Sequence, residues 1–236
     1  DESLLSAIQV AVPETTAADI AASAKSMWDV RVERLGGGNA DLTEKGTATG
    51  YAEWERDRAG ATHALIPYWI ELAVKATLAL DSYYPDGDIN YSLQADEMVD
   101  VLFTCVDAEG YFSSSDSNQK EYIVGLTGAI EASAETGLHI EEANSLKSIL
   151  LALQETNGSW AYYGGTVDAA SGAAQSTAYA IMALFAQGDE AAMTAAFNAA
   201  DWLVDTQNDG WHSEGEGSAE VTEVDSECAW ALYHAG

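Results

Sequence analysis

A short pattern that occurs twice constrains the fold more than any other feature of this sequence. Each copy joins a glutamine, a glycine and a tryptophan through a polar turn, after an amphipathic stretch and before an alanine-rich one. The copies are Gln154, Gly158 and Trp160, and Gln207, Gly210 and Trp211. Their glycines lie 52 residues apart. A period of this length is typical of a repeated helical hairpin.

Apolar residues spaced three and four positions apart predict helices along most of the chain, and no stretch alternates with period two for long enough to predict a strand. We therefore expect an all-α fold of about four stacked hairpins. Amphipathic helices with one solvent-facing side should alternate with small-residue helices that are buried on most sides. The predicted helices span residues 1–11, 16–35, 61–80, 122–134, 176–186 and 226–232, and apolar stripes over residues 98–105, 146–153 and 193–204 predict the amphipathic helices between them.

The predicted hairpins are the units of a single repeat domain over residues 1–236. Residues 90–236 contain three clear units, whereas residues 1–80 contain a degenerate first unit. This first unit includes the longest predicted loop, residues 36–60, which is rich in glycine and threonine. Long loops in compact domains are often functional. Pro67 lies inside the predicted helix that follows, where it predicts a kink or a broken first turn.

The charge of the chain is strongly negative, with 9 Lys and Arg against 39 Asp and Glu and a net charge of −30. Residues 81–236 hold only two of the basic residues, and none follows Lys147. Such a surface repels phosphate backbones and anionic lipids, so we expect no nucleic-acid binding. Scarce lysine with abundant acids resembles the composition of halophilic proteins, in which salt screens the self-repulsion. An ordinary acidic secreted protein is the alternative.

The two Gln–Gly–Trp turns resemble the QW repeats of the squalene cyclase and protein prenyltransferase superfamily. This resemblance implies a partial α/α toroid in which the glutamine and tryptophan tie neighbouring hairpins together. It covers residues 90–236 well and residues 16–80 poorly. The catalytic motifs of the family do not carry over: the Asp-x-Asp-Asp motif of hopene cyclases is absent, and residues 225–229 match only the first residue of the oxidosqualene cyclase motif.

His63 and Tyr68 form a candidate catalytic pair at the start of the predicted helix 61–80. In a helical toroid such a pair would suit a polysaccharide lyase, because one residue removes a proton beside a carboxylate and the other protonates the leaving group. Arg56 and Arg58 could neutralise that carboxylate. The alternative is a histidine at a helix start beside core aromatic residues.

Aromatic residues outside the turns are candidates for ligand binding, because tyrosine and tryptophan combine a flat apolar ring with a polar edge. Those that could line a central cavity are Tyr51, Trp54, Trp69, Tyr179 and Trp230.

The sequence contains two candidate metal sites, one for calcium and one for zinc. Asp86, Asp88 and Asn90 place oxygen atoms at alternate positions, as calcium loops do, although the sequence around them does not complete an EF-hand. A plain helix–helix turn is the alternative, so the calcium site is a candidate and no other cofactor is expected.

Asp225, Cys228 and His234 carry zinc-ligand chemistry, although an offset of six places His234 off the shared helix face. The alternative makes Asp225 or Ser226 a helix N-cap and Cys228 a core residue. Cys105 and Cys228 both lie in predicted apolar helices, which favours two buried thiols over one disulfide.

These observations favour a non-catalytic binding module of a halophilic organism, secreted or on the cell surface, that binds a glycan, an apolar molecule or another protein. A carbohydrate lyase or hydrolase, or a prenyl-substrate enzyme, is the first alternative, and a self-assembling surface subunit that forms homo-oligomers is the second. The start of the chain has no basic leader, so we expect that a leader was removed; the cytoplasm of a salt-in halophile stays open. No apolar run is long enough to predict a membrane span.

Overall fold

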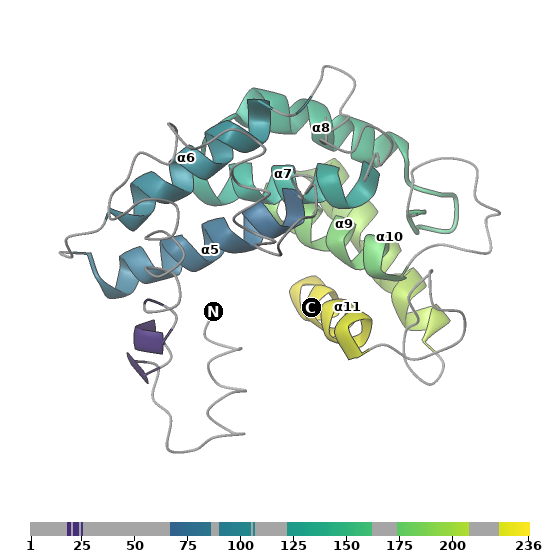
Figure 1. Cartoon of the computed structure of the whole chain (residues 1–236). Helices are drawn as coiled ribbons and strands as arrows, with labels where there is room; N and C mark the ends of the chain where they lie inside the picture. The colour runs from purple at the N-terminus through teal and green to yellow at the C-terminus, as the bar shows by residue number, and fades with distance from the viewer. Residues whose placement is uncertain are drawn as a thin grey trace, which may run out of the picture.

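The computed structural model describes residues 18–19, 21–23, 25, 67–85, 90–104, 106, 122–161, 174–207 and 222–236. This part of the chain is helical and contains no β-strand, which confirms the predicted all-α class (Figure 1). The helices with complete bounds are α5 (Pro67–Tyr83), α6 (Tyr91–Thr104), α7 (Tyr122–Thr136), α8 (Ile140–Ala152), α9 (Ala174–Gln187), α10 (Glu190–Thr206) and α11 (Thr222–Ala235).

The helices form two rows. Helices α5, α7, α9 and α11 pack one against the next, and we call them the odd row. Helices α6, α8 and α10, the even row, each pack against odd-row neighbours. In Figure 1, α6 and α8 run along the top, α5, α7 and α9 lie beneath them, and α11, in yellow, lies below α9. Consecutive helices therefore alternate between the rows.

Residue size explains this alternation. Helices α7 and α9 are rich in Ala, Gly, Ser and Thr, which permits close approach of neighbouring backbones, and both are buried along most of their length. Helix α8, in contrast, buries only Ala143, Leu146 and Leu150. The predicted pairing of a half-exposed helix with a small-residue buried helix is thus confirmed here.

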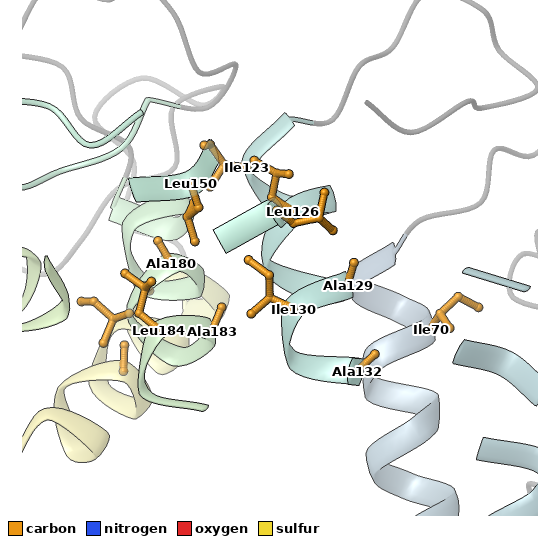
Figure 2. Close-up of a cluster of buried hydrophobic side chains, with 14 of the residues drawn as sticks. Ile70, Ile123, Leu126, Ala129, Ile130, Ala132, Leu150, Ala180, Ala183 and Leu184 are labelled. Atoms are coloured by element: carbon orange, nitrogen blue, oxygen red, sulfur yellow. The ribbon is translucent and has the colours of Figure 1, made fainter. Parts of the chain in front are cut away.

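The hydrophobic core lies where α7 and α9 meet the even row. Ile123, Leu126 and Ile130 of α7 approach Leu150 of α8 and Leu184 of α9 (Figure 2). All five side chains are fully buried. Burial of each such side chain stabilises the fold by roughly 1.5–3 kcal/mol relative to exposure.

Helix α5 is described from Pro67 onward and residues 61–66 lie outside the described part, so the predicted effect of the proline stays a prediction. The start of α11 differs from the sequence-based expectation. Helix α11 begins at Thr222, so Asp225 and Ser226 lie inside its first turns and neither is the N-cap. The Ser226 hydroxyl instead donates a hydrogen bond to the Thr222 carbonyl.

Within the described residues, no helix combines the length and apolar character that crossing a membrane requires.

Candidate functional site

The first Gln–Gly–Trp turn joins three helices. Gln154 Nε2 donates hydrogen bonds to the carbonyl oxygen of Gly158 in the turn and to that of Ala195 in α10, both at 2.9 Å. Trp160 is completely buried, and its Nε1 donates to the Leu150 carbonyl at 2.8 Å. Its backbone N–H donates to Thr177 Oγ1 of α9 at 3.1 Å. The turn therefore fixes α8 against both α9 and α10.

The second copy of the turn is only partly described. Gln207 is the exposed C-cap residue of α10, and its backbone N–H donates to the Leu203 carbonyl at 3.1 Å. Gly210 and Trp211 lie outside the described residues. The equivalence of the two turns stays a prediction.

Several candidate residues also fall outside this part of the chain. Tyr51, Trp54, His63, Asp86, Asp88 and Cys105 are not among the described residues. Tyr68 and Trp69 belong to the first turn of α5 by their backbone, and their side chains are not described. The catalytic pair and most of the calcium loop therefore stay predictions.

Asn90 has a local structural role. Its Oδ1 accepts a hydrogen bond from the Leu93 N–H at 2.9 Å, one turn into α6, as an N-cap side chain does. This contact supports the helix–helix turn that the sequence left open as the alternative to calcium. Among the described residues, no group of three His, Cys, Asp or Glu is placed to hold a metal ion.

Cys228 is a buried free thiol whose Sγ contacts the Ala174 carbonyl at 3.7 Å. Burial, followed by the charges of Glu227 and Asp225, raises the pKa of this thiol well above its ordinary value. Cys228 packs as a small core residue between α11 and α9.

Tyr179 and Trp230 are the two predicted ligand-binding residues whose side chains are described. Tyr179 is only 3% exposed, and its hydroxyl bonds to Glu227 Oε1 of α11. Gln175 Nε2 donates to the other carboxylate oxygen of Glu227 at 2.8 Å. Trp230 follows Glu227 by one helical turn and is half-buried. The structure thus pairs Tyr179 with Glu227, and Trp230 lies one helical turn further along α11.

A second polar cluster, between α5 and α7, was missed by the sequence analysis. Lys75 Nζ lies 2.5 Å from Glu71 Oε1 and donates a hydrogen bond to Glu131 Oε2 at 2.7 Å. Glu71 is 1% exposed and Glu131 5% exposed. The available signal was an i, i+4 pair of opposite charges in an apolar helix, with Glu131 in a helix of small residues.

Burial governs the electrostatics of this cluster. It raises the pKa of Glu71 to about 8, and the negative charge of Glu131 adds to the effect. Burial also raises the pKa of Glu131. For Lys75, burial opposes the charged form, but the two carboxylates outweigh it and raise the pKa of the ammonium. Both carboxyl groups therefore favour the protonated form more than an exposed glutamate does, and the ammonium of Lys75 stays charged beside them.

The two clusters are connected through α11. The pKa of His234, near the end of α11, is lowered first by burial and then by the positive charge of Lys75 in α5. The spacing of Glu227, Trp230 and His234 places them on one stripe of α11. We call the two clusters together the polar face; Glu71, Glu131 and Tyr179 form its buried part. Its residues are Glu71, Lys75, Glu131, Gln175, Tyr179, Glu227, Trp230 and His234.

A separate open groove of about 760 Å³ lies in the even row, between the end of α8 and the first turns of α10. Gln154 and Leu151 line one side, and Asp189 and Thr194 line the other. Asp189 caps α10 by accepting hydrogen bonds from the backbone N–H groups of Ala191 and Ala192. Its other carboxylate oxygen pairs with Lys147 of α8.

Comparison with models of protein families, with curated proteins and with solved structures finds no match to this chain.

Proposed function

We propose that this protein is a non-catalytic binding module, built as a partial α/α toroid, whose polar face binds a glycan. The observation that carries the proposal is the set of polar and aromatic groups that four odd-row helices bring together. Binding sites for small molecules place a few oriented polar groups beside aromatic rings. Here the Glu227 carboxylate is held by Tyr179 and Gln175, one helical turn from the half-buried ring of Trp230.

Burial favours binding over catalysis. A general acid or base must come within hydrogen-bond reach of its substrate. Glu71 and Glu131 are almost wholly buried, and both are engaged by Lys75. Glu227 is likewise engaged by two protein donors, an arrangement that suits a fixed acceptor of hydroxyl hydrogen bonds better than a proton-transfer group.

The composition supports a halophilic source, and we propose a secreted or cell-surface location. A net charge of −30 repels acidic polysaccharides as well as nucleic acids. The proposed ligand is therefore a glycan without carboxylate or sulfate groups.

The test is calorimetric titration of the whole chain with cello-, malto-, xylo- and chito-oligosaccharides in molar KCl. We expect one of these series to bind, and Trp230→Ala to weaken that binding at least tenfold. Trp202→Ala is the matched control, because Trp202 is half-buried on α10 of the even row. Absence of binding in every series, or equal losses in the two variants, would contradict the proposal.

One observation favours an enzyme as the second candidate. Glu71, with a pKa raised to about 8, lies beside Glu131, whose pKa is also raised by burial, and carboxyl groups with strongly perturbed pKa values are typical of acid–base catalysis. The same oligosaccharides, incubated with the protein and assayed for new reducing ends, test this candidate. Product that disappears in Glu71→Gln would support catalysis, and no product at any pH between 5 and 9 would exclude it for these substrates.

A further inference from the structure

Three rings form a contiguous aromatic surface on α11. Trp230 and Tyr233 stack with ring centroids 5.8 Å apart and an angle of 23° between their planes. His234 meets Trp230 edge-to-face at 5.0 Å and Tyr233 at 5.9 Å. Tyr233 is 66% exposed, the highest value among the large hydrophobic residues of the described part. We call Trp230, Tyr233 and His234 the α11 aromatic patch.

The charges around this patch are mainly negative. Glu223 and Glu227 precede Trp230 by two turns and one turn on the same stripe of α11. The chain has no Lys or Arg beyond Lys147, so neither α9, α10 nor α11 supplies a basic side chain. Among the described residues, Lys75 of α5 is the cation whose charge acts on His234, and it is engaged by Glu71 and Glu131. The lowered pKa of His234 keeps its ring neutral at pH 7.

Aromatic faces attract cations because their π systems carry negative charge. The molecule already uses this contact elsewhere: Lys25 Nζ lies 5.7 Å from the ring centroid of Tyr84 and 5.8 Å from that of Tyr91. The α11 aromatic patch offers the same chemistry without a lysine of its own helix. Neighbouring carboxylates add to the attraction for an incoming positive charge.

We infer that the α11 aromatic patch binds an alkylammonium group, such as the amine of a deacetylated amino sugar or a choline-type headgroup. This inference rests on the proposed function in that it names the ligand class of the same region. The observation that carries it is charge complementarity: the exposed rings of Tyr233 and His234 pack against the half-buried ring of Trp230, and carboxylates flank them on a strongly acidic chain.

The decisive experiment compares two probes of the same shape and different charge. Choline and 3,3-dimethyl-1-butanol are titrated into the whole chain, and Trp fluorescence or chemical shifts of α11 report binding. We expect choline to bind about threefold to tenfold more tightly than the neutral alcohol. Equal affinities would identify a merely hydrophobic patch and overturn the inference, as would no detectable binding of choline.

Variants locate the site. Tyr233→Ala removes an exposed ring without touching the core, and we expect it to abolish the preference for choline. Tyr83→Ala is the matched control, since Tyr83 is 45% exposed at the end of α5. A preference that survives in Tyr233→Ala and also in Trp230→Ala would place the cation elsewhere and contradict the inference.

The source of the ammonium group is tested separately. Glucosamine oligosaccharides are compared with their N-acetylated counterparts, and vesicles with choline headgroups are compared with vesicles of a neutral glycolipid. Tighter binding of the glucosamine oligosaccharides or of the choline-headgroup vesicles than of their neutral counterparts supports the inference and identifies the source. Equal binding within both comparisons contradicts the inference. Binding of N-acetylated or other neutral sugars alone would leave the proposed function intact while removing this inference, so the two failures are distinguishable.

Discussion

Gly158 permits the close approach of the first Gln–Gly–Trp turn to α10. Its φ of +95° lies in the left-handed region, and a Cβ at this position would lie 2.5 Å from the Asn198 carbonyl oxygen. That oxygen belongs to the α10 backbone and cannot rotate away. The residue must therefore be glycine for two independent reasons, its conformation and its neighbour.

A pair of glycine substitutions separates these reasons. Gly137 also has a positive φ, +74°, but nothing lies within 4 Å of the position that a Cβ would occupy there. We expect Gly137→Ala to lower the free energy of unfolding by about 1 kcal/mol, from backbone strain alone. Gly158→Ala should cost at least about 3 kcal/mol, because strain and overpacking combine. Urea denaturation measures both, and similar losses would show that the contact with Asn198 does not matter.

The raised pKa of Glu71 makes the free energy of unfolding depend on pH. Its pKa rises from an ordinary 4.5 to about 8 in the folded chain, so between these values the native state binds more protons than the unfolded state. Stability must then fall as the pH rises through this window. An ordinary carboxyl group in water has a pKa near 4, below this window.

The variant Glu71→Gln removes this titration while preserving shape. Between pH 5 and pH 8 we expect the variant to gain about 1–3 kcal/mol in unfolding free energy relative to the wild-type chain. Glu141→Gln, an exposed position in the first turn of α8, is the control and should leave the slope unchanged. Parallel pH profiles for wild type and Glu71→Gln would refute the buried protonated carboxyl.

At the scale of the element, the Gln154 side chain at the end of α8 connects the first Gln–Gly–Trp turn to α10. Gln154→Met keeps the length of the side chain but leaves the carbonyls of Gly158 and Ala195 without their donor. We expect a loss of about 1–3 kcal/mol in unfolding free energy. Gln207→Met should change stability by less than about 0.5 kcal/mol, since Gln207 is exposed. Equal losses at both positions would favour full equivalence of the two turns.

Helices with a strong apolar pattern could be predicted from the sequence, and their polar ends could not. The predicted range 122–134 corresponds to α7 and the range 176–186 to α9, within two residues at each end. Helix α8 begins at Ile140, six residues before the apolar stripe that predicted it. The stripe missed this exposed first turn because the turn carries Glu141 and Glu142. Helix α11 likewise starts early, through polar residues that resemble a loop.

The sequence could predict only those residues of the candidate site whose side-chain type alone suggests ligand binding. Tyr179 and Trp230 are aromatic residues in apolar helices, and composition alone singles them out. Glu131 gains its significance from Lys75, which is 56 residues away in the chain. Such a partnership depends on how α5 packs against α7, and one sequence contains no information on that contact.

At the scale of the whole molecule, self-repulsion is the dominant electrostatic effect. The chain has 9 basic residues to offset 39 acidic ones. Lys75 and Lys147 both make ion pairs, and the contacts of Lys75 are internal to a buried cluster. The acidic residues therefore far outnumber the cations that could compensate them, and the resulting repulsion must weaken as salt is added.

We therefore expect the melting temperature to rise by roughly 10 °C between 0.1 M and 1 M KCl, which corresponds to about 3–5 kcal/mol for a chain of this size. The rise should level off near 1 M, where the Debye length is about 3 Å and screening is nearly complete. Circular dichroism follows the transition, with sucrose of equal osmolality as the control for solute exclusion.

Two results would contradict screening. If sucrose matched KCl, or if the melting temperature kept rising linearly to 3 M KCl, exclusion of solute from the surface would explain the stabilisation better than screening. If the melting temperature did not respond to KCl at all, the carboxylates would have to be protonated or paired through residues outside the described part, and the proposed halophilic character would lose its physical basis.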